Sequence, residues 1–170
     1  MRGKIGLSVL IVVLALVLLV SGASSISADS GSATYIYLIE TDTAMASNGD
    51  TITLTGFGTL SIHPKSVTGG GTFTHMDAAG NVLGSGTWTA TQLLSFNGYG
   101  CGGDGLPDDF CGGRANISVH LSSGFDAVLQ IDCVIGSPPA GAIEGVRLAV
   151  QSGPNFNREV SGDNLFILQP

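Results

Sequence analysis

Beyond residue 28, this chain of 170 residues has no sustained 3.6-residue repeat of apolar side chains. A chain without that repeat forms no substantial amphipathic helix, so we expect an all-β protein. The sequence also lacks the G-x-S-x-G, H-E-x-x-H and Walker A motifs, and its three histidines lack the spacing of metal ligands. These absences argue against the enzyme classes that such motifs mark.

Positive charge is scarce as well. The chain has six Lys and Arg residues against thirteen Asp and Glu residues, and two of the six basic residues stand among the first four positions. Without that N-terminal pair the net charge is about −9, which argues against nucleic acids and anionic membrane surfaces as partners. Abundant Gly, Thr and Ser are typical of an extracellular β protein with many tight turns.

The one long hydrophobic run lies near the N-terminus. Two basic residues precede an apolar stretch over residues 5–20, and small residues follow it. This order predicts a signal peptide over residues 1–28, with cleavage near Ala23 or Ala28. An uncleaved membrane anchor is the alternative, but the run is shorter than the roughly 20 apolar residues that a spanning helix needs. We therefore expect a secreted, extracellular protein with no stable membrane insertion after cleavage.

Short segments of alternating polar and apolar residues, separated by turns, fill residues 29–170. The pattern predicts about eight or nine short strands in a single all-β domain. Short turns favour an antiparallel meander that closes into a small barrel, and a two-sheet β-sandwich is the alternative. We expect the longest strand at 125–135, a bulge at 56–58 and a polar break at 151–157.

The clearest hairpin spans residues 69–96 and contains the only tryptophan. Its turn lies at 77–81, where a glycine accepts the positive φ that such turns require. Alternation then places Phe73, His75 and Trp88 on one face, with glycines opposite the aromatic rings. We expect these three side chains to line a barrel mouth that contacts a small ligand. The alternative is a half-buried histidine with a structural role.

A Cys-, Gly- and Asp-rich stretch at 98–113 is expected to form a loop that interrupts the meander. It contains Cys101 and Cys111, and we expect these cysteines to form a disulfide, because disulfides persist in proteins that are exported. Cys133 would then remain as a buried thiol. A bridge between Cys133 and one of the loop cysteines is the competing arrangement.

Within this stretch, the sequence DGLPDD at 104–109 resembles the core of calcium-binding loops in thrombospondin type 3-like and related bacterial repeats. The resemblance covers six residues and implies Asp104 and Asp108 as ligands, with Asp109 as a third carboxylate. Ca²⁺ prefers about six to eight oxygens, so three carboxylates would form a weak site. We expect either a weak Ca²⁺ site or a solvated acidic loop here, and no other cofactor.

Together these features predict a secreted binding or surface module without enzymatic activity, whose partner is a small ligand or a cell-surface component. A hydrolase or isomerase that uses His75 with a carboxylate in the barrel mouth is one alternative. A self-assembling surface or filament subunit is the other. It is suggested by exposed Thr and Gly faces and by a first strand that has an open edge.

Overall fold

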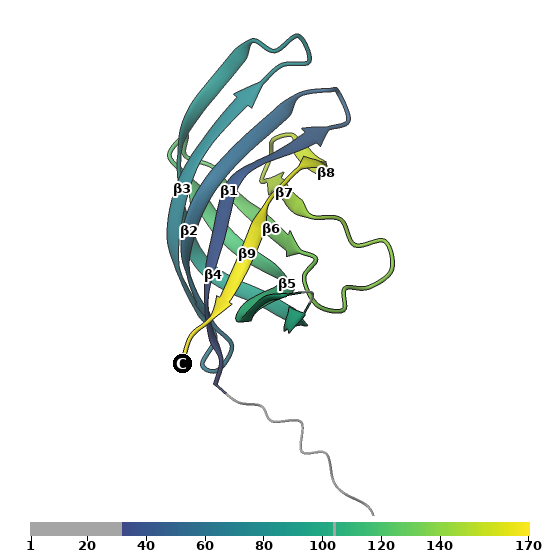
Figure 1. The fold of residues 1–170 in the computed structure, drawn as a ribbon. Coiled ribbons are helices and arrows are strands. Elements are labelled where there is room, and N and C mark those ends of the chain that lie inside the picture. Colours follow the sequence, from purple (N-terminus) through teal and green to yellow (C-terminus); the bar gives the residue numbers. More distant parts are fainter. Residues whose placement is uncertain (1–31, 104) are drawn as a thin grey trace, which may run out of the picture. The chain divides into compact units, whose positions relative to one another are not determined.

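The computed structural model describes residues 32–103 and 105–170 and is all-β (Figure 1). The predicted signal peptide over residues 1–28 lies outside the described residues. A single antiparallel sheet contains nine strands. The strands are β1 (Thr34–Ala46), β2 (Thr51–Ser61), β3 (Ser66–Met76), β4 (Val82–Gly103), β5 (Leu106–Leu121), β6 (Asp126–Cys133), β7 (Gly145–Val150), β8 (Asn155–Ser161) and β9 (Asn164–Leu168).

The predicted meander is confirmed, because each strand from β1 to β7 pairs antiparallel with the next one along the chain. β8 then pairs with residues 43–46 of β1, so eight strands close into a ring. β9 runs beside residues 35–39 of β1 and also pairs with residues 110–111 of β5. β1 therefore has partners on both sides, and the open edge expected for the first strand is absent from the described sheet.

β8 has no counterpart among the predicted strands. The stretch at 151–157 is expected to be a polar break, yet β8 begins at Asn155 and closes the ring. Phe156 is the one fully buried residue of this strand. A strand with one buried side chain has no visible alternation, which explains why composition predicts a break.

The longest strands are β4 and β5, with 22 and 16 residues, whereas β6 has 8 residues and ends before the predicted limit of the 125–135 strand. The stretch at 98–113, expected as a loop, forms the paired ends of β4 and β5. Cys101 lies directly opposite Cys111 in this pairing. Glycine lowers strand propensity but leaves the backbone hydrogen bonds intact, so a glycine-rich segment can still extend a hairpin.

The indole ring of Trp88, which comes from β4, packs against glycine backbone of β2 and β3. Gly56 pairs with Gly71 across the two strands. A Cβ added to Gly56 would lie 2.3 Å from the indole ring. The indole Nε1 donates a hydrogen bond to the backbone oxygen of Thr55 at 3.0 Å. Trp88 is thus buried over its neighbouring strands, as the pairing of glycines with aromatic residues predicts.

Tyr37 from β1 lies on the next glycine pair in the same way. Gly58 pairs with Gly69, and Cβ atoms added to them would lie 2.5 Å and 2.7 Å from the phenol oxygen. The hydroxyl donates to the backbone oxygen of Thr68 at 2.9 Å. Burial raises the pKa of the Tyr37 hydroxyl, so the group stays protonated and continues to donate.

The prediction of a bulge at residues 56–58 is wrong. Pairing between β2 and β3 continues without a register shift through this region. The irregularity lies in the partner strand β1, where the pairing with β2 shifts between Ile39 and Asp42. The glycines in β2 therefore provide room for aromatic rings and do not interrupt the strand.

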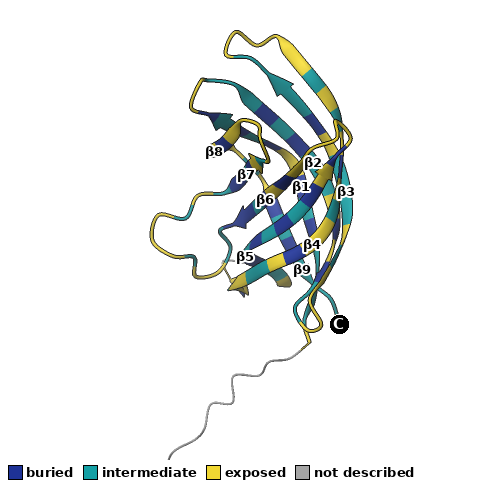
Figure 2. Ribbon diagram, turned by 180° about the vertical axis from the view of Figure 1, so that it is seen from behind, coloured by how far each residue is buried: buried dark blue, intermediate teal, exposed yellow. Residues whose placement is uncertain are grey.

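The two ends of the ring differ. Phe96 packs between Tyr35 and Phe166, with ring centroids 4.8 Å and 5.0 Å away, and these aromatic side chains fill one end. The turns β1–β2, β3–β4, β5–β6 and β7–β8 gather at the other end, because consecutive strands run in opposite directions. Figure 2 shows buried and exposed positions alternating along the strands between these ends. No helix long and apolar enough to cross a membrane occurs among the described residues.

The glycine backbone under Trp88 predicts a specific loss of stability. In Gly71→Ala the new Cβ would lie 1.8 Å from the Thr55 backbone oxygen, so β2 and β3 must move apart. We expect the free energy of unfolding in urea to fall by about 2–3 kcal/mol. Gly84→Ala is the matched control in β4, because its Cβ would meet nothing within 4 Å. Equal urea midpoints for the two variants would contradict the close packing.

Candidate functional site

A concave pocket of about 400 Å³ lies at the end of the ring where the four turns gather. Its apolar lining includes Ile52, Phe73, Leu121 and Phe156, which come from β2, β3, β5 and β8 and are all buried. These residues stand at strand ends and face the interior, so the pocket is the unfilled continuation of the core. An apolar depression of this kind suits a small ligand.

One imidazole adds polarity to this apolar lining, and a carboxylate beside the pocket contacts that imidazole. His75 lies near the end of β3, and its Nε2 is 3.2 Å from Oδ2 of Asp50 in the β1–β2 turn. Their side chains are 24% and 15% exposed. The His75 ring also meets the ring of Phe156 edge to face, at a centroid distance of 5.2 Å. The imidazole is therefore fixed on one side while remaining accessible from the pocket.

The structure brings together two of the three residues predicted for ligand contact. Phe73 and His75 both line the pocket. Trp88 shares their face of the sheet but lies deeper, where it is 1% exposed and covers the glycine backbone. Sequence reasoning misses two residues that contact His75: Phe156, which lines the pocket, and Asp50, which lies in the turn beside it. Both approach His75 from strands or turns that are distant in sequence, and alternation within one hairpin carries no signal for them.

The rim of the pocket is also partly apolar. Leu83 and Phe125 are 57% and 48% exposed and belong to the lining. The hydroxyl residues Ser123 and Ser152 lie in the turns beside them. Ser152 has a φ of 59°, a left-handed backbone conformation that non-glycine residues seldom adopt. The mouth thus combines apolar contact area with a few hydroxyl groups.

The predicted disulfide is confirmed, since Cys101 and Cys111 are bonded across β4 and β5. Cys133 is a buried free thiol, which rules out the competing bridge. Burial raises the pKa of the Cys133 thiol to about 11. A thiol of that kind carries almost no thiolate at neutral pH and behaves as a small apolar side chain.

The proposed calcium ligands do not form a defined cluster in the described part of the chain. Asp108 and Asp109 lie near the start of β5 and are exposed, and Asp104 lies outside the described residues. Among the residues that the structure describes, no group of three His, Cys, Asp or Glu side chains is arranged to hold a metal ion. The weak Ca²⁺ site therefore stays a prediction.

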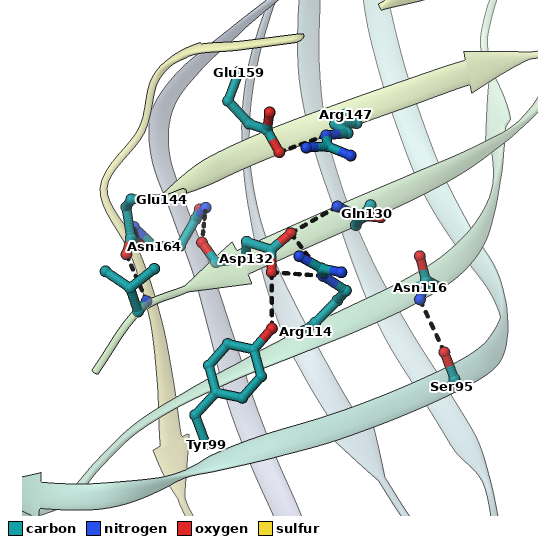
Figure 3. A network of polar contacts seen from close by, with 11 residues as sticks. Ser95, Tyr99, Arg114, Asn116, Gln130, Asp132, Glu144, Arg147, Glu159 and Asn164 are labelled. Carbon is teal, nitrogen blue, oxygen red and sulfur yellow. Dashed lines mark hydrogen bonds and ion pairs between the residues drawn. The ribbon is translucent and has the colours of Figure 1, made fainter. Parts of the chain in front are cut away.

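A separate polar network surrounds Asp132, near the end of β6 that lies away from the pocket (Figure 3). The buried carboxylate accepts hydrogen bonds from Arg114 Nε at 2.8 Å and 3.0 Å. It also accepts from Gln130 Nε2 at 2.6 Å and from the Tyr99 hydroxyl at 3.1 Å. Donors from β4, β5 and β6 thus satisfy one buried charge, which indicates a structural role.

A second buried acidic group lies between β1, β9 and the loop before β7. Asp42 is fully buried, and its Oδ1 accepts a hydrogen bond from the Asp163 backbone N–H at 3.0 Å. The Glu144 carboxylate accepts from the backbone N–H groups of Val134 and Asn164 at 2.7 Å and 2.9 Å. Burial raises the pKa of both carboxyl groups, and repulsion between them raises the pKa of Glu144 further. The folded protein therefore holds protons here more tightly than the unfolded chain does.

This acidic pair predicts that stability falls as pH rises. The folded-state pKa values of Asp42 and Glu144 lie above their unfolded values. Their contribution to the free energy of unfolding is therefore complete in acid and is lost as pH rises through the raised pKa values. A tenfold change in proton affinity corresponds to about 1.4 kcal/mol. In urea unfolding from acidic to mildly alkaline pH, Asp42→Asn should gain stability relative to wild type as pH rises. The exposed Asp109→Asn is the control, and parallel curves for all three proteins would contradict the prediction.

In comparisons with known proteins, no family model, no curated protein and no solved structure matches this chain. The chemistry of the pocket is therefore the basis on which we infer function.

Proposed function

We propose that this protein is a secreted, non-enzymatic binding module whose pocket holds a small, largely apolar ligand. The observation that carries the proposal is the pocket of about 400 Å³, which is lined by core side chains at one end of the ring. Small-molecule sites are usually apolar hollows that contain a few placed polar groups, and His75 with Asp50 fits that description. Burying apolar ligand surface contributes about 25 cal/mol per Å².

The compartment follows from two features that support one another. The disulfide between Cys101 and Cys111 is typical of oxidising compartments. The predicted signal peptide over residues 1–28 gives a route to such a compartment. An extracellular module with an acidic surface would meet free small molecules or cell-surface components as ligands.

A hydrolase or isomerase is the second candidate, and the contact between His75 and Asp50 favours it. A carboxylate that orients an imidazole is a common arrangement in general-base catalysis. Covalent catalysis would also need a nucleophile hydrogen-bonded to the base, and His75 makes no such bond within residues 32–103 and 105–170. We favour binding for this reason. Self-assembly loses one of its two arguments, because β1 is paired on both sides.

Filling the pocket tests the proposed function. Gly84 lies opposite His75 in the β3–β4 pairing, and a Cβ there would meet nothing within 4 Å. Gly84→Leu should therefore occupy the pocket without disturbing the fold. With naphthalene as the probe in equilibrium dialysis, we expect affinity to fall about tenfold or more, which is about 1.4 kcal/mol.

Ser85→Leu is the matched control, because the neighbouring side chain points to the outer face and is exposed. It should bind naphthalene as the wild type does, and both variants should keep the wild-type urea midpoint. Equal naphthalene binding to both variants would refute the proposed function, and so would a wild type that binds neither naphthalene nor a naphthalene ring carrying a polar group.

A further inference from the structure

We propose that His75, held by Asp50 through Nε2, offers Nδ1 to the pocket as a hydrogen-bond acceptor, and that the pocket therefore selects apolar ligands carrying a hydroxyl or N–H donor. The inference rests on the proposed function and specifies the ligand class for that same pocket. It starts from Asp50, whose Oδ2 lies 3.2 Å from His75 Nε2. An ionised carboxylate only accepts hydrogen bonds, so Nε2 must carry the hydrogen. In a neutral imidazole, Nδ1 is then the acceptor.

The acceptor has room for a partner. Within the part of the chain that the structure describes, the bond to Asp50 is the only hydrogen bond that the His75 side chain makes. The residue directly opposite His75 on β4 is Gly84, which has no side chain, and a Cβ there would meet nothing within 4 Å. Open space therefore lies beside the imidazole on the inner face of the sheet. A ligand group can enter this space without moving the backbone.

The surrounding side chains define the rest of the ligand. Phe73, Leu121 and Phe156 form an apolar lining, and Phe156 also holds the imidazole from its side. An aromatic or alicyclic alcohol or a phenol matches both parts of the site: its ring contacts the lining, and its hydroxyl donates to Nδ1. A carboxylate of the same shape has no hydrogen to donate and would face the lone pair of Nδ1. Sites that bind a donor in this way reject analogues that lack it.

Asp50 is the positioning residue in this arrangement, because it fixes which nitrogen carries the hydrogen. In Asp50→Asn the amide offers both a donor and an acceptor, so either tautomer of His75 finds a partner. The variant should therefore lose preference among ligands while keeping its affinity for an apolar ring. A merely structural role of Asp50 would weaken all ligands alike.

Three ligands of nearly equal size provide the test: 1-naphthol, naphthalene and 1-naphthoate, measured by equilibrium dialysis at neutral pH. We expect the wild type to bind 1-naphthol about tenfold more tightly than naphthalene, and 1-naphthoate most weakly. His75→Phe should remove the preference for 1-naphthol and retain naphthalene binding. Asp50→Asn should reduce the preference, and urea midpoints close to wild type would show that both variants remain folded.

The outcomes separate the two proposals. Equal affinity for 1-naphthol and naphthalene would overturn the donor selection and leave the binding pocket in place. Tighter binding of 1-naphthoate would also overturn it, because His75 would then act as a hydrogen-bond donor. Failure of all three ligands to bind the wild type would overturn the proposed function together with the inference.

Discussion

The close approach of two aromatic rings to bare backbone is the constraint on which the rest of this structure depends. Trp88 and Tyr37 come from β4 and β1, the strands on either side of β2 and β3, and both lie on paired glycines. Side chains at Gly56, Gly58 or Gly69 would meet these rings, and one at Gly71 would meet the backbone of β2. Each ring also donates its polar hydrogen to a backbone oxygen of the strand beneath it. The interior is thereby filled across four strands, and the pocket begins where this layer ends.

The pocket inherits its character from that arrangement. Along the inner face of β4, Gly84 and Gly86 precede Trp88. Phe73 occupies the space beside Gly86, where an added Cβ would lie 3.1 Å from its ring, whereas Gly84 leaves open space near the mouth. His75 stands opposite the first of these glycines. The contact with Asp50, from the β1–β2 turn, then fixes one side of the imidazole. The site is therefore an apolar hollow at the end of the core, with one imidazole held by a carboxylate at its edge.

Local patterns predict much of this fold, and their failures have physical causes. Alternation and turn residues place the 69–96 hairpin correctly and put Phe73, His75 and Trp88 on one face, because period and register act within a few residues. β8 escapes prediction because Phe156 alone is fully buried in it. Asp50 escapes because its contact with His75 joins a turn to the next hairpin. Fold class is thus encoded locally, whereas the site depends on closure of the ring.

The pairing of β1 has a consequence for the order in which the protein can be completed. Ala44, near the beginning of the described chain, pairs with Glu159, and Tyr35 pairs with Leu168. During synthesis from the N-terminus, one edge of β1 therefore stays unpaired until β8 and β9 are available. Contacts so distant in sequence slow folding, and an exposed strand edge invites pairing with other chains. Aggregation through this edge would thus be avoided if the chain does not collapse before β8 and β9 are available. Transport of the chain in an unfolded state would allow this order.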